Sequence, residues 1–457
     1  MSKSAMNLPN RREFLQTSTL ASASVALSAC NTAPRRATHR SPNDKLNIAA
    51  VGVGGKGSGD IASTSRGQNV VAICDVDNKT LEQAAKTYPK ARKYHDWRQM
   101  LQQSGIDAVT ISTPDHMHAP IAMAAIQLGK HVYVQKPMTH TIEEARLLTA
   151  AAKYHGVVSQ MGNQHHSSTG YKTLVQAIRS GVIGKIKSAH AWSNRPGWPQ
   201  DIGRPQGDEP IPDNLWWDLW IGVAPYRSFV GPKQGDRRNR GPYHPFNWRG
   251  FLDFGVGALG DMGCHIIDPV VWSLNLGAPG RVWSDGPITN GESYPAWEII
   301  HYEFPATEYC SGENVQMTWY DGGKKPDAKL IPGAADKDIP SNGSLFIGEK
   351  GVLMCSHGGK PELWPKGDFA NTRLIEIPGD DHYQQWTNAC KGEGTTVSTF
   401  DYSGPMTETV LLGTIAIRFP GQRLDWDSKN LLFTNEARAN QFVRKSYRPG
   451  WVPRGLA

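Results

Sequence analysis

The sequence predicts an α/β protein whose N-terminal part is a doubly wound parallel sheet. A short apolar, β-prone run at residues 46–51 ends directly in a glycine-rich turn. Further apolar runs at residues 70–74, 107–112 and 131–134 alternate with helical stretches such as residues 119–128. Strands and helices that alternate in this way form parallel sheets with helices on both faces.

The glycine-rich turn has the pattern GxGxxG, formed by Gly52, Gly54 and Gly57. In this pattern the first glycine permits a tight turn, the second lets the backbone approach a pyrophosphate, and the third allows close helix packing. The N-terminus of the following helix faces the phosphates. The pattern alone is weak evidence, but its place between a strand and a helix predicts a dinucleotide-binding domain.

Asp75 ends the second strand, 23 residues after the first glycine, near the usual separation of about 20. A carboxylate there can accept hydrogen bonds from the adenosine ribose and repels a 2′-phosphate, so we expect NAD rather than NADP. The alternative is an aspartate that only caps a loop.

Ligands of doubly wound sheets bind beyond the carboxyl ends of the strands. Thr113, Pro114 and His118 follow one strand, and Lys136 follows the next. We therefore expect these four residues beside the cofactor.

Three motifs of the sequence resemble the glucose-fructose oxidoreductase / inositol dehydrogenase / MocA (Gfo/Idh/MocA) family. They are Thr113-Pro114 followed by His118, Lys136-Pro137, and the set Asp261, His265 and Asp268. The resemblance runs from about residue 46 to the end. It implies an N-terminal Rossmann domain, a C-terminal α/β domain with an open, mostly antiparallel sheet, and a homo-oligomer paired through that sheet. Gln135 stands where the family usually has glutamate, which changes the charge beside Lys136.

Asp261, His265 and Asp268 are spaced i, i+4 and i+7, so in a helix they project from one face. Hydride transfer from a hydroxyl-bearing carbon needs a base, and histidine has an ordinary pKa near 6.5. The resemblance places the set opposite the nicotinamide. We predict His265 as general base, Lys136 as donor to the substrate oxygen or modulator of the histidine, and Asp261 as an orienting group.

Other interpretations of these residues remain open. His265 and the carboxylates could form a satisfied core network, and Asp268 could be structural because Pro269 kinks the helix. A metal site would need further ligands that no motif supplies, so we predict none. His165 and His166 either reach the cleft or, as we expect, lie at the surface.

The segment from residue 192 to residue 248 is dense in Trp, Pro, Gly and Arg. Aromatic rings stack on the apolar faces of sugars, which favours a carbohydrate substrate. Tryptophan also buries a large area wherever it lies, so a local packing cluster explains the segment equally well.

The N-terminus resembles an export signal. Arg11 and Arg12 precede a mildly apolar stretch of the twin-arginine type, and a lipobox-like run ends at Cys30. We expect export, to the periplasm or as a lipoprotein anchored through Cys30. A plain signal with an incidental cysteine is the alternative.

The predicted organisation is a signal at residues 1–30, a linker at 31–45, an NAD-binding domain at 46–160 and a substrate and oligomerisation domain at 161–457. The composition is 39% hydrophobic and 20% charged with a net charge of +7, which suits a globular enzyme. There is no long Lys/Arg block, so we expect no nucleic-acid partner. The cysteines after Cys30 are widely spaced and odd in number, which argues against a disulfide framework.

We therefore expect an NAD-dependent oxidoreductase acting on a sugar or polyol. A glycosidase that oxidises its sugar transiently and retains its NAD is the second hypothesis. The third is a sugar-binding lipoprotein that has lost its chemistry.

Overall fold

The fold is that of a computed structural model, which describes residues 41, 43–233 and 240–456. The predicted signal and Cys30 lie outside these residues, as does all but the last part of the predicted linker. The described residues group into one compact unit, and the domain boundary at residues 160 and 161 stays a prediction.

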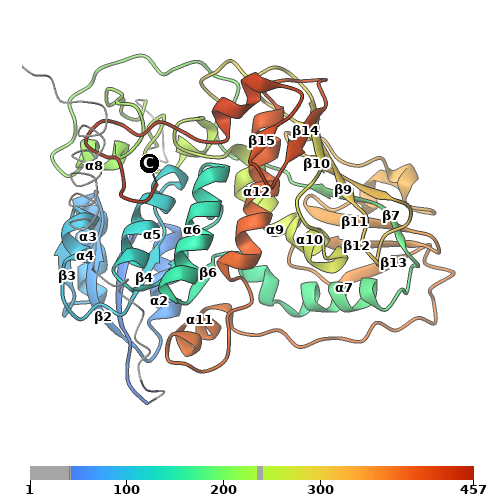
Figure 1. Cartoon of the computed structure of the whole chain (residues 1–457), viewed down its shortest axis with the longest axis horizontal. Helices are drawn as coiled ribbons and strands as arrows, with labels where there is room; N and C mark the ends of the chain where they lie inside the picture. The colour runs from blue at the N-terminus through green and yellow to red at the C-terminus, as the bar shows by residue number, and fades with distance from the viewer. Residues whose placement is uncertain (1–40, 42, 234–239, 457) are drawn as a thin grey trace, which may run out of the picture. The chain divides into compact units, whose positions relative to one another are not determined.

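The first sheet has six parallel strands in the order β3-β2-β1-β4-β5-β6, which is the doubly wound arrangement that the sequence predicts (Figure 1). Helices cover both faces, so β4 and β5 are buried throughout. The strands are β1 (Asn47–Val51), β2 (Asn69–Cys74), β3 (Arg92–Tyr94), β4 (Ala108–Ile111), β5 (His131–Val134) and β6 (Ser159–Met161). The helices are α2 (Lys56–Thr64), α3 (Asn78–Thr87), α4 (Trp97–Leu101), α5 (His118–Gln127) and α6 (Ile142–His155).

The second sheet has nine strands in the order β13-β12-β11-β7-β10-β9-β8-β14-β15. Only the pair β7–β10 is parallel among its described strands, so the expected mostly antiparallel sheet is confirmed. The strands are β7 (Ile186–Trp192), β8 (Arg281–Asp285), β9 (Ile299–Pro305), β10 (Asn314–Tyr320), β11 (Gly343–Gly348), β12 (Val352–Ser356), β13 (Pro361–Trp364), β14 (Leu424–Asp427) and β15 (Leu432–Phe433).

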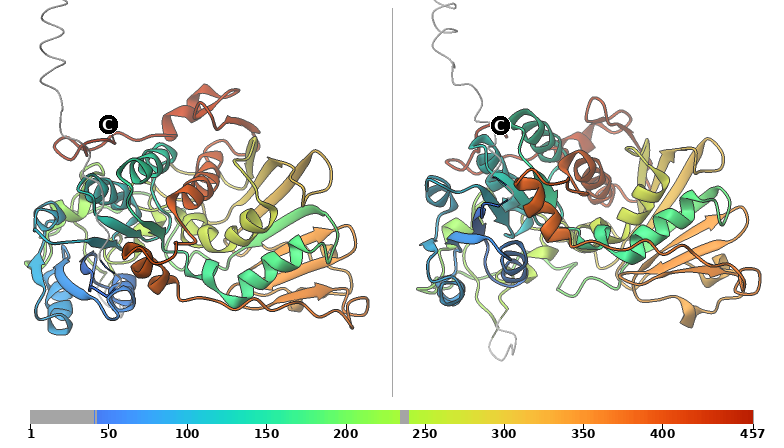
Figure 2. Two further views of the ribbon diagram at one scale, coloured as in Figure 1. Left: turned by 60° about the horizontal axis from the view of Figure 1, so that its bottom comes forward. Right: turned by 90° about the horizontal axis from the view of Figure 1, so that it is seen from below.

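Helices lie along one face of this second sheet (Figures 1 and 2). They are α7 (Thr169–Arg179), α9 (Gly257–Ile266), α10 (Asp268–Leu274) and α12 (Phe400–Ala416). Burial alternates along β9, as expected for a strand whose two faces have different surroundings. The short helix α8 (Trp217–Ile221) lies in the aromatic segment between β7 and α9.

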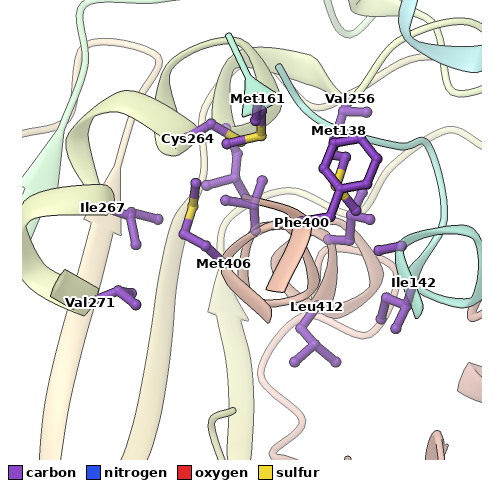
Figure 3. Packing of buried hydrophobic residues seen from close by; sticks show 14 of the residues in the cluster. Met138, Ile142, Met161, Val256, Cys264, Ile267, Val271, Phe400, Met406 and Leu412 are labelled. Atoms are coloured by element: carbon purple, nitrogen blue, oxygen red, sulfur yellow. The ribbon is translucent and has the colours of Figure 1, made fainter. Parts of the chain in front are cut away.

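The main apolar core joins the two sheets through α12. Figure 3 shows Met406 and Phe400 of α12 packed beside Met138 and Met161 from the first half and Cys264 of α9. Helix α12 also contacts α6. The parts of the chain that form the two sheets are therefore held by one continuous hydrophobic cluster.

Helix α11 (His382–Cys390) returns from late in the sequence to the first sheet. Its Trp386 and Cys390 are fully buried against Leu46, Ile48 and Tyr133. Helix α11 also contacts α2, the helix that follows the glycine turn.

The five described cysteines are buried free thiols. Within the part of the chain that the structure describes, no helix combines the length and the apolar character that crossing a bilayer requires.

Candidate active site

A cavity of about 830 Å³ opens at the carboxyl ends of the strands of the first sheet. Nine of the ten sequence-predicted site residues line it, and only Gly57 does not. The nine are Gly52, Gly54, Asp75, Thr113, Pro114, His118, Lys136, Asp261 and His265. The structure thus brings residues from both halves of the chain to one cavity.

The glycine turn allows two close approaches of backbone to backbone. Gly52 has φ +77°, and a Cβ there would lie 2.6 Å from the carbonyl oxygen of Ser112. A Cβ at Gly57 would lie 1.9 Å from the carbonyl oxygen of Gly52. No side chain caps the N-terminus of α2, so its first amide groups are free of side-chain acceptors. A turn of this kind has room and donors for a phosphate.

Asp75 lies at the end of β2, beside this turn. Its carboxylate accepts hydrogen bonds from the backbone amides of Val53 (3.0 Å) and Asp77 (2.9 Å). Burial raises the pKa of Asp75 to about 6, while hydrogen bonds from these amides act in the opposite direction.

The ring of His118 supports the backbone beneath the cavity. Its Nδ1 lies 2.8 Å from the carbonyl oxygen of Pro137, and its Nε2 lies 2.8 Å from that of Thr113. Burial lowers the pKa of His118 to about 4. The hydroxyl of Thr113 is buried without a hydrogen-bond partner among the described residues. His118 therefore ties together the two segments that follow β4 and β5.

Lys136 and Asp261 form an ion pair across the cavity. The Lys136 Nζ donates to the Asp261 Oδ1 at 2.9 Å and to its backbone oxygen at 2.5 Å. Arg249 Nε lies 3.4 Å from the same carboxylate, and Arg195 Nε lies 3.6 Å from it. Burial alone would raise the pKa of Asp261, but Lys136 and the two arginines lower it below its usual value. Asp261 is therefore an ionised carboxylate surrounded by three positively charged side chains.

His265 lies one turn after Asp261 on α9, on the same side of the helix. Its ring is 5.5 Å from that of His357 and 6.1 Å from that of His165, measured between centroids. Its Nδ1 is buried without a partner among the described residues. Burial, together with Lys136, lowers the pKa of His265 well below its usual value, so the imidazole is neutral near pH 7.

Asp268 does not share a helix with Asp261 and His265, so the expectation that all three project from one helix face is wrong. Helix α9 ends at Ile266, and α10 begins at Asp268 with Pro269 in its first turn. Proline lacks an amide hydrogen and crowds the preceding turn, which accounts for the break. The alternative interpretation of Asp268 as a structural residue fits the structure.

Asp268 is fully buried in a network of its own. His166 Nδ1 lies 3.0 Å from both oxygens of its carboxylate, and the Tyr402 hydroxyl donates to it at 2.5 Å. The ring of His166 stacks on Trp272 at 3.9 Å. The expected surface position of His166 is therefore wrong, while His165 lies beside His265.

The aromatic segment forms a local core and also borders the cavity. Trp217 and Trp220 stack at 4.6 Å, and Tyr243 packs against Phe251 at 4.7 Å. Trp220 is also one of the cavity residues, with Phe246 and Trp248. Both interpretations of the segment are thus consistent with its position.

Sequence reasoning missed several cavity residues. Asp115 is buried, its carboxylate accepts a hydrogen bond from the Val256 amide at 3.1 Å, and burial raises its pKa to about 7. It stood inside the Thr-Pro motif, which was the available signal. Arg249 also lines the cavity, from the short 3-10 helix Asn247–Gly250. Arg195 and His357 lie beside the cavity residues Asp261 and His265, and no motif marks any of these three.

No group of three or more His, Cys, Asp or Glu side chains in residues 43–233 and 240–456 has the arrangement of a metal site.

Residues 46–163 match a family described as an oxidoreductase family with an NAD-binding Rossmann fold. Residues 185–339 match the C-terminal α/β domain of the same family, and the two matches cover more than half of the chain. The chain belongs to the Gfo/Idh/MocA oxidoreductase family. Its first domain is therefore an NAD-binding Rossmann domain, which confirms the resemblance noted from the motifs.

Proteins that are similar in sequence to this chain include a glycosyl hydrolase and a dehydrogenase. Glycosyl hydrolase family 109 protein 2 of Shewanella sp. (strain ANA-3) is 33% identical over 207 residues, which are 40% of this chain and 45% of that protein. Levoglucosan dehydrogenase of Pseudarthrobacter phenanthrenivorans is 30% identical over 196 residues, which are 43% of this chain and 40% of that protein. These matches span less than half the length of either relative.

Solved structures are similar over more of the chain. The WlbA dehydrogenase of Bordetella pertussis, in complex with NADH and UDP-GlcNAcA, has a TM-score of 0.57 at 18% identity and covers 84% of this chain and 99% of its own. The aldose-aldose oxidoreductase of Caulobacter crescentus has a TM-score of 0.54 at 15% identity, over 84% of this chain and all of its own. At these identities the likeness concerns the fold.

Proposed function

We propose that this protein is an NAD-dependent oxidoreductase that acts on a hydroxyl group of a sugar or polyol. One observation carries the proposal: the Lys136–Asp261 pair and His265 line the same cavity as the glycine turn. The names of the relatives, which include levoglucosan dehydrogenase and inositol 2-dehydrogenase, support a substrate of this class.

The residues at the glycine turn fit a dinucleotide. A Cβ at Gly52 or Gly57 would close the turn, and the uncapped amides of α2 would face the pyrophosphate. Asp75 would accept hydrogen bonds from the ribose hydroxyls, and its charge disfavours a 2′-phosphate, so we propose NAD rather than NADP. When bound, NAD supplies the hydride acceptor.

The remaining steps belong to side chains of this chain. His265, neutral near pH 7, accepts the proton of the substrate hydroxyl. Lys136 donates a hydrogen bond to the same oxygen, where negative charge develops. Asp261 keeps the ammonium group of Lys136 in place through the 2.9 Å contact.

The experiment follows reduced-cofactor absorbance when a panel of sugars and polyols is added with NAD, for the natural protein and for Lys136→Ala. We expect the variant to lose about 100-fold or more in kcat while its NAD affinity changes little, since removing one hydrogen-bond donor to a developing negative charge costs about that much. Lys153→Ala, an exposed lysine on α6, is the matched control. Activity of Lys136→Ala equal to that of the natural protein would contradict the assignment.

A glycosidase with transient oxidation is the second candidate, because a family 109 glycosyl hydrolase is among the similar relatives. It predicts release of the leaving group from a glycoside without net change of cofactor. Mass spectrometry of the nucleotide released by denaturing the purified protein separates the two, because this candidate requires copurified NAD. A requirement for stoichiometric added NAD would exclude it.

We also propose export of the protein, on the sequence of residues 10–30 alone. Replacing Arg11 and Arg12 with lysines should retain the protein in the cytoplasmic fraction, and Cys30→Ala should abolish labelling by a radioactive fatty acid. Unchanged fractionation and labelling would contradict it.

A further inference from the structure

Asp60 is a fully buried carboxylate on α2 that the proposed reaction does not use. Four side chains contact it, one from the same helix and three from distant parts of the chain. They are Ser112 (Oγ, 2.8 Å), Gln135 (Nε2, 2.9 Å), Tyr383 (hydroxyl, 3.1 Å) and Lys56 (Nζ, an ion pair). A buried carboxylate with this many donors is held tightly in one position.

The contact with Gln135 requires an amide at position 135. Gln135 is 5% exposed, and its Nε2 has only the Asp60 carboxylate to donate to within the described contacts. A Cβ at residue 162 would lie 2.6 Å from that nitrogen, so Gly162 leaves just enough room for the amide. A glutamate here would place two carboxylates at hydrogen-bond distance, and such a pair cannot ionise fully without strong repulsion.

Asp60 thereby fixes the ends of two neighbouring strands. Ser112 follows β4 and precedes Thr113, and Gln135 follows β5 and directly precedes Lys136. The carboxylate belongs to the helix that begins at the glycine turn. One side chain therefore sets the position of the glycine turn relative to Lys136.

We propose that Asp60 is a positioning residue that acts through Gln135. The pair must consist of one carboxylate and one amide to keep Lys136 correctly placed relative to the cofactor site. The inference rests on the proposed NAD-dependent function, which it deepens. It predicts that the carboxylate and the amide can be exchanged between positions 60 and 135, but that the two positions cannot both carry acids.

The test compares three variants of the full chain: Gln135→Glu, Asp60→Asn, and the two combined. NADH affinity is measured by fluorescence titration from mildly acidic to mildly alkaline buffer, with melting temperature measured alongside. In Gln135→Glu the two acids can share a proton only at low pH. We therefore expect its NADH affinity to fall about tenfold or more as the pH rises, whereas the natural protein stays nearly constant. The combined variant should regain most of the affinity and lose the pH dependence.

Gln83→Glu, at an exposed position of α3, is the matched control and should behave as the natural protein. An affinity of Gln135→Glu that equals the natural protein at every pH, or a combined variant no better than Gln135→Glu, would overturn the inference. Failure of the natural protein to bind NADH would instead contradict the proposed function. In that case the melting temperature of Gln135→Glu, which should fall with rising pH and recover in the combined variant, still decides whether the pair exists.

Discussion

At the scale of single residues, the charge balance around His265 governs its readiness to accept a proton. Lys136 is the largest charged contributor after burial to the low pKa of this histidine, and His357 and His165 add to it. The acid side of the pH profile of kcat/KM should therefore lie well below pH 6.5.

Removing the Lys136 charge should raise the pKa of His265. In Lys136→Met, the acid side of the kcat/KM profile of the residual activity should accordingly move to higher pH than in the natural protein. The measurement is turnover of the best substrate of the panel across the pH range. A shift in the opposite direction would show that the lysine is not close to the titrating group.

Asp75 decides between the two nicotinamide cofactors in our proposal. Replacing it with alanine removes the negative charge near the ribose. The ratio of the affinity for NADH to that for NADPH should therefore fall by about tenfold or more. Affinities for NADH and NADPH, measured by fluorescence titration, check this. Asp208→Ala, at an exposed position, should leave the preference unchanged.

At the scale of elements, helix α2 contains one glycine that has no space for a side chain and one that does. A Cβ at Gly57 would overlap the carbonyl oxygen of Gly52, whereas a Cβ at Gly59 would meet nothing within 4 Å. Gly57→Ala should therefore lower the melting temperature and abolish NADH binding. Gly59→Ala should stabilise the protein by about 0.5–1 kcal/mol, since alanine favours a helix. Equal stabilities of the two variants would contradict the close packing.

The elements of the first sheet were predictable because their signals are local. The strands β1, β2, β4 and β5 are short apolar runs, and the GxGxxG turn and Asp75 follow strands directly. The short strands β3 and β6 are polar and carry no such signal. The helix break at Asp268 was harder, because the i, i+4, i+7 spacing favours one helix and only Pro269 opposes it.

Much of the candidate site could not be predicted from the sequence. Arg195 and His357 lie outside the helices and strands, and Arg249 lies in a short 3-10 helix, so only the tertiary fold brings them near Asp261 or His265. The role of Gln135 was equally hidden. Its partner Asp60 shows no pattern in the sequence, and the pair became visible as a 2.9 Å contact.

At the scale of the whole molecule, a buried acid pair makes stability depend on pH: Glu298 directly precedes β9, and Asp321 directly follows β10. Asp321 accepts hydrogen bonds from Trp319 Nε1 (2.9 Å) and from the Glu298 amide (3.2 Å). Burial raises the pKa of Asp321 from 3.8 to about 7 and raises that of Glu298 well above its usual value. The folded state thus holds protons that the unfolded state releases, so stability should fall as pH rises from about 4 to about 7.

Glu298→Gln keeps the shape and removes one of the two acids. Its melting temperature should fall less between about pH 5 and pH 8 than that of the natural protein. Glu349→Gln, an exposed glutamate, is the control and should keep the natural slope. Parallel slopes in all three proteins would show that the pair does not titrate in this range.

Helix α11 has a consequence for how the chain matures. Trp386 and Cys390 complete the apolar surface formed by Leu46, Ile48 and Tyr133, although more than two hundred residues separate the two sides. During synthesis the nucleotide-binding half leaves the ribosome long before helix α11, which covers this apolar surface, has been made. Until translation is nearly finished, that half carries an exposed hydrophobic surface. We therefore expect an isolated fragment ending near residue 163 to aggregate.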